Sequence, residues 1–170
     1  IFNGVDLALF KNGLDPDLHP DVDWHNTILR DHSWNQQAHL SASGGGQVAR
    51  YYMSLGFINK EALMKQAKGV TPYSTNVNYR QYNFRANVDV NMTKSTILNL
   101  GLETTIVTQN YPGYGNSTDA LWQAASNLTP ITVPLRYSSG EYPAYGSDNN
   151  QISPYVLLNL TGYRNTYRNN

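Results

Sequence analysis

The sequence predicts an all-β fold of antiparallel strands, and three observations support this fold class. Residues 82–92 alternate without an error between two kinds of side chain. On one side of an extended chain lie Tyr82, Phe84, Ala86, Val88, Val90 and Met92, and on the other lie Asn83, Arg85, Asn87, Asp89 and Asn91. Only 14% of the residues are charged, and the 13 tyrosines and 13 glycines suit strands and loops better than helices. Short turns also alternate with long connections along the chain.

The first segment, residues 1–35, is predicted to be a loop region that contains one short helix. Glycines and prolines interrupt it repeatedly, which favours irregular structure. Asp23 is a suitable N-cap for a helix that ends near Asp31. Such a helix places Trp24 and Ile28 one turn apart on the same side.

The second segment, residues 36–108, contains four predicted strands in two hairpins. The first hairpin joins strands at about 36–43 and 49–58 through three consecutive glycines, which adopt positive φ without steric cost. The second hairpin joins strands at about 81–92 and 96–108 through the short turn Thr93-Lys94-Ser95. Every strand has one largely apolar side and one largely polar side.

The long connections are residues 59–80 and the region 109–170, where one short helix is predicted at Asp119 to Ser126, capped by Ser117 or Thr118. A loop of about 60 residues is unusual in a compact soluble domain. Short turns on one side and long loops on the other are typical of outer-membrane barrels, whose strands need only about 9 to 11 residues to cross the bilayer. Periodicity alone also permits a soluble β-sandwich.

Composition excludes several classes of function and leaves others open. Lys and Arg together number 12, as do Asp and Glu, so the net charge of zero provides no basic field for nucleic acid. The absence of cysteine excludes a disulfide scaffold and zinc-thiolate sites, but it does not decide the compartment. No run of 18 apolar residues marks a transmembrane helix.

Several ordered stretches resemble the SusC/RagA family of TonB-linked outer-membrane transporters. They are Asp23-Trp24, Gln37-Ala38-His39-Leu40-Ser41-Ala42-Ser43-Gly44-Gly45, Tyr51-Tyr52-Met53-Ser54-Leu55-Gly56-Phe57-Ile58-Asn59, Tyr82-Asn83-Phe84-Arg85-Ala86-Asn87-Val88-Asp89, and Leu157-Leu158-Asn159-Leu160-Thr161-Gly162-Tyr163. The resemblance implies a transmembrane β-barrel of 22 strands, of which this chain holds about four, with long extracellular loops that carry short helices. It also implies that 1–35 and 109–170 are extracellular, and that both ends of the chain are cuts through a longer protein.

In a barrel the apolar sides of the strands face lipid and the polar sides face the lumen, because every backbone group pairs within the closed sheet. The candidate lumen-facing residues are Asn83, Arg85, Asn87, Asp89, Asn99 and Glu103. Arg85 and Asp89 lie on the same side of one strand and are candidates to contact a plug or the substrate. The alternative is a structural role in which they pair with neighbouring strands.

The candidate contact residues in the last loop region are Tyr137, Tyr142, Tyr145 and Asp148. Aromatic rings beside acidic and amide groups stack on sugars and hydrogen-bond to them, so this loop is a candidate contact for a glycan or a lid protein. The alternative is ordinary loop packing.

No metal, cofactor or catalytic centre is predicted. His25, His32 and His39 are spaced by seven residues, so they would lie on the same side only of one continuous helix. The predicted helix ends before the third histidine. The acidic cluster Asp15, Asp17, Asp21 and Asp23 lacks the glycine and the closing glutamate of a calcium loop. No phosphate loop, nucleophile elbow or carboxylate pair occurs, so the chain is not expected to be an enzyme.

By resemblance, the expected function is uptake of oligosaccharides or peptides across the outer membrane of a Bacteroidetes-like bacterium. The expected partners are the remaining barrel and plug of the same transporter, a SusD-like surface lipoprotein, the TonB complex, outer-membrane lipid, and the glycan or peptide cargo. The alternative is a soluble β-rich module that binds glycans through its tyrosine-rich loops.

Overall fold

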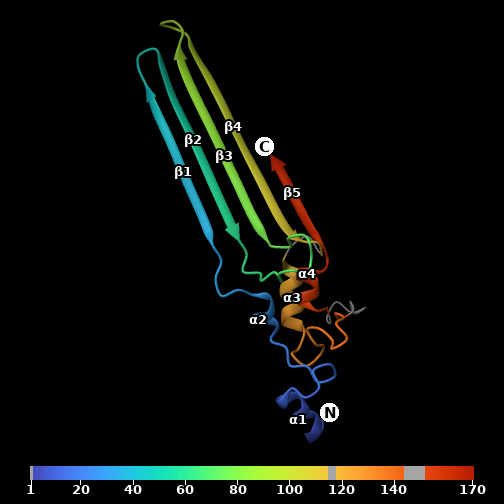
Figure 1. Ribbon diagram of the computed structural model, residues 1–170. Helices are drawn as coiled ribbons and strands as arrows, with labels where there is room; N and C mark the ends of the chain where they lie inside the picture. The colour runs from blue at the N-terminus through green and yellow to red at the C-terminus, as the bar shows by residue number, and fades with distance from the viewer. Residues whose placement is uncertain (1, 115–117, 144–151) are drawn as a thin grey trace. The chain divides into compact units, whose positions relative to one another are not determined.

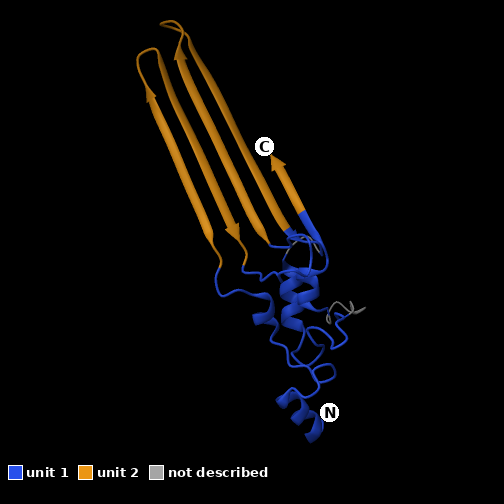
Figure 2. Ribbon diagram, in the orientation of Figure 1, with its two compact units in different colours: residues 1–32, 63–76, 111–164 blue, residues 33–62, 77–110, 165–170 orange. Residues whose placement is uncertain are grey.

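The computed structural model describes residues 2–114, 118–143 and 152–170. These residues form two compact units (Figure 2). Unit 1 contains residues 1–32, 63–76 and 111–164, and unit 2 contains residues 33–62, 77–110 and 165–170. No helix in the described part of the chain is long and apolar enough to cross a membrane.

A five-stranded sheet in the sequential order β1-β2-β3-β4-β5 forms the main structure (Figure 1). Its strands are β1 (Asn35–Gly45), β2 (Ala49–Glu61), β3 (Asn78–Asn91), β4 (Ile97–Pro112) and β5 (Tyr163–Asn169). The first four strands are paired antiparallel. Thr105 of β4 and Asn170, which directly follows β5, exchange two backbone hydrogen bonds of 3.0 and 3.1 Å. Directly opposed residues of two antiparallel strands form such a pair of bonds. The all-β antiparallel fold class is therefore confirmed.

The two tight turns are both closed by backbone hydrogen bonds. After β1, the amide of Gly46 donates to the carbonyl oxygen of Ala49 at 2.7 Å, and Gly45 has a φ of 158°. Between β3 and β4, the amide of Met92 donates to the carbonyl oxygen of Thr96 at 3.0 Å, and Thr93 and Thr96 bond to each other. These turns fix the register of the two hairpins, in which Leu40 is paired with Leu55 and Phe84 with Thr104.

The sheet is longer than the sequence indicates, and it is open. β4 continues to Pro112, and β5 lies inside the region 109–170 that the sequence assigns to a loop. β5 is missed because Arg164, Asn165, Thr166 and Arg168 leave it no continuous apolar side. The five described strands do not close, so the predicted 22-stranded barrel is not formed by the described residues.

The described part of unit 1 contains four helices: α1 (Gly4–Asn12), α2 (Trp24–Ile28), α3 (Asp119–Asn127) and α4 (Pro154–Asn159). Asp23 caps α2 as predicted, since its carboxylate accepts the Asn26 amide at 3.0 Å, but α2 ends at Ile28 rather than near Asp31. Thr118 is the N-cap residue of α3 without a side-chain hydrogen bond, and the other predicted cap, Ser117, lies outside the described residues.

The core of unit 1 forms where α4 packs against α2 and α3. Its apolar side chains that are at most 3% exposed include Trp24, Ile28, Met64, Leu121, Ala125, Leu157 and Leu158. The sequence predicts that Trp24 and Ile28 lie on the same side of α2, and this is the side that is buried in the core. The indole of Trp24 also donates to the carbonyl oxygen of Thr129 at 3.3 Å, which ties α2 to the segment after α3.

Gly113, just after β4, lies where no larger residue fits. Its amide donates to the carbonyl oxygen of Gly162 at 2.9 Å, and a Cβ at this position would be 2.1 Å from the carbonyl oxygen of Thr161. We expect Gly113→Ala to destabilise unit 1 by about 1 to 3 kcal/mol, because the backbone must move apart to admit the methyl group. Denaturant-dependent proteolysis measures the loss. Gly4→Ala is the control, since nothing lies within 4 Å of its added Cβ, and equal effects of both changes would contradict the prediction.

Candidate functional site

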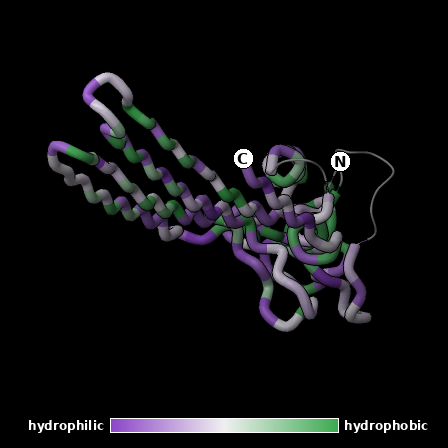
Figure 3. Tube along the Cα trace, turned by 90° about the horizontal axis from the view of Figure 1, so that it is seen from above, coloured by the Kyte–Doolittle hydropathy of each residue, from purple (hydrophilic) through white to green (hydrophobic). Residues whose placement is uncertain are grey.

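The register of the sheet sorts its side chains into an apolar face and a polar face. Figure 3 shows hydrophobic and hydrophilic residues alternating along the strands. Paired residues share a face, so β1 to β4 contribute to the apolar face in rows: Ala38, Phe57, Tyr82 and Ile106; Leu40, Leu55, Phe84 and Thr104; Ala42, Met53, Ala86 and Leu102; Gly44, Tyr51, Val88 and Leu100.

Large side chains on the apolar face are exposed. The exposed fractions are 68% for Leu40, 54% for Leu55, 56% for Leu100 and 60% for Leu102. Contacts across the strands do not cover them, although the rings of Phe57 and Tyr82 touch with centroids 5.2 Å apart. Isolated exposed leucines are common on proteins, but a continuous apolar patch over four strands marks an interaction surface or a membrane surface.

The opposite face carries a polar ladder, which we define as Gln81, Asn83, Arg85, Asp89, Asn99, Glu103 and Thr105. The guanidinium of Arg85 donates to the Glu103 carboxylate at 2.8 Å, and the amide of Asn99 donates to the Asp89 carboxylate at 2.7 Å. The carbonyl oxygen of the Asn83 side chain accepts from Gln81 at 2.8 Å and from Thr105 at 3.0 Å. The ladder links β3 to β4 from side chain to side chain.

All six candidate lumen-facing residues are therefore on one face of the sheet. Five of them belong to the polar ladder. The sixth, Asn87, lies opposite Gly101 of β4, and a Cβ added to Gly101 would be 3.4 Å from the side-chain oxygen of Asn87. Arg85 and Asp89 do not pair with each other but with partners on β4. This is the cross-strand pairing that the structural alternative describes. Whether these residues line a lumen stays a prediction.

The candidate loop residues are only partly within the described chain. Tyr137 belongs to a tight turn in which its amide donates to the carbonyl oxygen of Glu141 at 2.9 Å. Tyr142 stacks on Tyr155 of α4, with centroids 5.7 Å apart, and the guanidinium of Arg136 lies 5.3 Å from the Tyr142 ring. Tyr145 and Asp148 lie outside the described residues. The sequence analysis missed Arg136 and Tyr155, and no local pattern links them to Tyr142.

Tyr155 has an altered acidity that a titration can detect. Burial raises the pKa of Tyr155 above its ordinary value of 10.0, and the hydrogen bond with Tyr142 raises it further. The native state therefore holds this proton more tightly than the unfolded state. Its contribution to stability is complete below the unfolded pKa and is lost as pH rises through the folded pKa.

We expect Tyr155→Phe to remove absorbance from the alkaline end of a tyrosinate titration, above the ordinary pKa of 10.0. The free energy of unfolding of the variant should also fall less steeply with pH in that range. Tyr142→Phe removes the hydrogen bond and should shift the Tyr155 ionisation downward. Loss of absorbance only at or below pH 10.0 in Tyr155→Phe would contradict this prediction.

The histidine and aspartate sets are dispersed among local roles. His25 lies in α2, His39 in β1 and His32 between them. Among the aspartates, Asp23 caps α2, and Asp17 accepts from both the amide and the hydroxyl of Ser138. Among the described residues, no group of three His, Asp or Glu is arranged to hold a metal ion.

Comparison with known proteins finds a likeness in structure but not in sequence. No protein-family model and no curated protein matches this chain. A chain in a solved structure of the RagAB peptide importer, in its closed-closed state, matches with a TM-score of 0.51 and 18% sequence identity. The match covers 82% of this chain and 15% of the importer chain. At this identity the likeness establishes that the two share a fold over the matched region.

Proposed function

We propose that this chain is part of the wall and the extracellular loops of an outer-membrane nutrient importer of the SusC/RagA type. In this proposal the apolar face of the sheet contacts lipid acyl chains and the polar face lines the interior. The protein imports rather than transforms its substrate. The likeness to a chain of the RagAB peptide importer supports a link to nutrient import.

The observation that carries the proposal is the exposed apolar face. Its rows run across four strands, and Leu40, Leu55, Leu100 and Leu102 are all more than half exposed. Water is a poor environment for such a face, because apolar area costs roughly 25 cal/mol per Å² when it is not removed from water. Lipid chains remove it from water along the whole length of the strands.

The edges of the sheet support the same proposal. All 11 residues of β1 are exposed, and among the strands that the structure describes β1 is paired with β2 alone. An unpaired row of backbone donors and acceptors promotes aggregation in water and is not tolerated in a lipid environment. Further strands at both edges satisfy these groups, in agreement with the fact that the match spans only 15% of the importer chain.

The polar ladder fits an interior surface. Its groups are already bonded across strands, so they present fixed charges and amides to water or to a plug. The remaining parts of the proposal follow from the resemblance: a plug that rearranges, energy from the TonB complex, a SusD-like lipoprotein that closes over the loops, and a cargo of peptides or oligosaccharides.

Localisation and growth test the proposal. The full-length protein that carries this chain is expected in the outer-membrane fraction and to require detergent for extraction. Deletion of its gene should slow growth on a peptide or an oligosaccharide as the limiting nutrient, and loss of TonB should have the same effect. A SusD-like lipoprotein should copurify with it.

The soluble glycan-binding module makes the opposite prediction. Residues 1–170 expressed alone without detergent would then be a monodisperse monomer with one cooperative melting transition, and would bind glycans. That result, together with absence from the membrane fraction, would overturn the importer proposal.

A further inference from the structure

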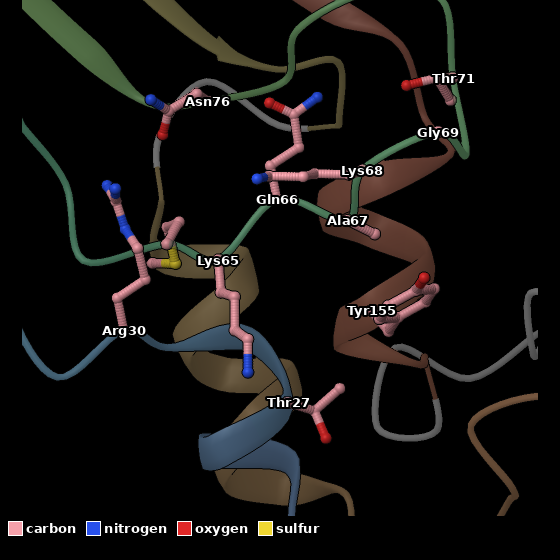
Figure 4. A pocket seen from close by; sticks show the side chains of 11 residues that line it. Thr27, Arg30, Lys65, Gln66, Ala67, Lys68, Gly69, Thr71, Asn76 and Tyr155 are labelled. Carbon is pink, nitrogen blue, oxygen red and sulfur yellow. The ribbon is translucent and has the colours of Figure 1, made fainter.

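Unit 1 contains a cavity of about 790 Å³ that the sequence analysis does not predict. Small-molecule sites have volumes of roughly 300 to 1,000 Å³. The cavity lies along the loop of residues 65–69, which runs between α2, with Thr27, and α4, with Tyr155 (Figure 4). All of its lining residues belong to unit 1: Thr27, Arg30, Met64, Lys65, Gln66, Ala67, Lys68, Gly69, Thr71, Asn76 and Tyr155.

The lining of this cavity is positively charged. Arg30, Lys65 and Lys68 contribute three cations, and neither aspartate nor glutamate is among the lining residues that the structure describes. Within the described residues neither lysine forms an ion pair, and Lys65 makes one long hydrogen bond of 3.4 Å to the carbonyl oxygen of Asn26. The side chains of Lys65 and Lys68 extend in different directions from the loop (Figure 4), so the two ammonium groups are separately available to an anionic ligand. An anion beside either of them is attracted by its positive charge.

The wall that carries the two lysines is held in place by buried contacts. Asn159, which is 1% exposed, accepts the amide of Ala67 at 2.8 Å and donates to the carbonyl oxygen of Tyr155 at 3.0 Å. The amide of Lys65 donates to the carbonyl oxygen of Ile28 at 2.7 Å. The loop is thus bonded to α4 on one side and to the end of α2 on the other. A preorganised wall loses little conformational entropy when a ligand binds.

The polar groups of the lining are fixed in a similar way. The side-chain amide of Gln66 donates to the carbonyl oxygen of Tyr73 at 3.1 Å, and its oxygen accepts from Ser74 at 3.1 Å. The phenol of Tyr155 forms a hydrogen bond with Tyr142, which helps to raise its pKa above the ordinary value of 10.0. The side-chain donors that the lining offers to a ligand are therefore the ammonium groups of Lys65 and Lys68.

We propose that this cavity binds the carboxylate group of a small ligand. Two kinds of compound that fit the volume supply a carboxylate: a short peptide through its C-terminus and an acidic oligosaccharide through a uronic acid. Lysine ammonium groups bind carboxylates, and they also bind phosphate, so inorganic phosphate is the competing anion that a binding experiment must distinguish. The interpretation of this ligand as cargo rests on the proposed importer function, but the binding itself does not.

Binding to the purified full-length protein in detergent tests the proposal. Isothermal titration calorimetry compares two pairs of probes. The first pair is trialanine and its neutral C-terminal amide, and the second pair is trigalacturonic acid and neutral galactotriose. We expect at least one of the two carboxylates to bind, its neutral counterpart to bind at least tenfold more weakly, and the affinity to fall as ionic strength rises. Whichever of the two acids binds more tightly shows whether the carboxylate belongs to a peptide or to an acidic oligosaccharide.

Three substitutions localise the binding. Lys65→Gln and Lys68→Gln are each expected to weaken it by up to about fivefold, the range for an ion pair of an exposed side chain. Lys94→Gln is the matched control with the same change of charge in the β3–β4 turn, and it should leave the affinity unchanged. Melting temperatures of the three variants show whether each is folded.

Four outcomes would overturn the proposal: no probe binds, the neutral probes bind as tightly as the acids, inorganic phosphate binds more tightly than either acid, or Lys94→Gln weakens binding as much as Lys68→Gln. These outcomes are separable from failure of the importer proposal. If the protein binds a carboxylate but is absent from the outer membrane, only the importer proposal is contradicted. If it is an outer-membrane importer but its cavity binds no carboxylate, only the present inference is contradicted.

Discussion

Replacing Ala86 with arginine is expected to destabilise the full-length protein in a bilayer by about 2 to 4 kcal/mol, the cost of a cation on the lipid face near the midplane. Ala86 lies near the middle of β3 and is paired with Met53 of β2 and Leu102 of β4, so it lies within the apolar face rather than at its margin. Urea unfolding in lipid vesicles, followed by heat-modifiable gel mobility, measures the loss.

The adjacent residue provides the control. Asn87 lies on the polar face, opposite Tyr52 and Gly101, so Asn87→Arg adds the same side chain one position away in the same strand. We expect that variant to fold and to unfold at nearly the wild-type urea concentration. Equal destabilisation by the two arginines would mean that neither face contacts lipid, and a larger effect of Asn87→Arg would reverse the assignment of the faces.

Leu158→Ala is expected to destabilise unit 1 by about 2 to 5 kcal/mol, because it removes buried methyl groups and leaves a cavity. The Leu158 side chain is 0% exposed in α4, the helix that packs against both α2 and α3. Faster hydrogen exchange of backbone amides in these helices is the measurement. Exchange in β2 and β3 should not change, because these strands belong to unit 2.

Leu18→Ala is the comparison for this core substitution, since the Leu18 side chain is 77% exposed. The same change of residue should there alter hydrogen exchange little. If the two variants behave alike, the helices of unit 1 do not form a stable core, and a fixed cavity beside them is excluded as well.

The strands of the sheet can be predicted from local sequence because alternate side chains belong to the apolar face and to the polar face. Alternation over 82–92 is sufficient to give the side to which Val88 and Asn87 point, and the glycine turn fixes the first hairpin. The six candidate lumen residues share a face for the same reason. Their bonds were not predictable, because Arg85 meets Glu103 only through the β3–β4 register.

The elements that sequence analysis misses depend on contacts between distant segments. β5 lacks an apolar side and forms beside β4, with the bond from Gly113 to Gly162 at its start. α4 has only six residues, too few to be stable without the core that buries Leu157 and Leu158.

The cavity is likewise assembled from segments that are distant in the sequence. Tyr155, Lys65 and Thr27 are brought together by the packing of unit 1, so no local motif indicates the site. The stack of Tyr142 on Tyr155 has the same origin. Loop composition predicted contact residues for a glycan or a lid protein here, which stays a prediction, and it did not indicate that Tyr142 meets Tyr155.

The most direct test of the central claim is the collision of spin labels on β3 with oxygen and with a water-soluble nickel complex, measured in lipid vesicles. The chain has no cysteine, so single cysteines label one position at a time in a cysteine-free full-length protein. We predict that labels at Phe84, Ala86 and Val88 collide mainly with oxygen in lipid, and that labels at Arg85 and Asn87 collide with the nickel complex. Nickel accessibility at all five positions, or exclusion of both reagents from Phe84, Ala86 and Val88, would contradict the account.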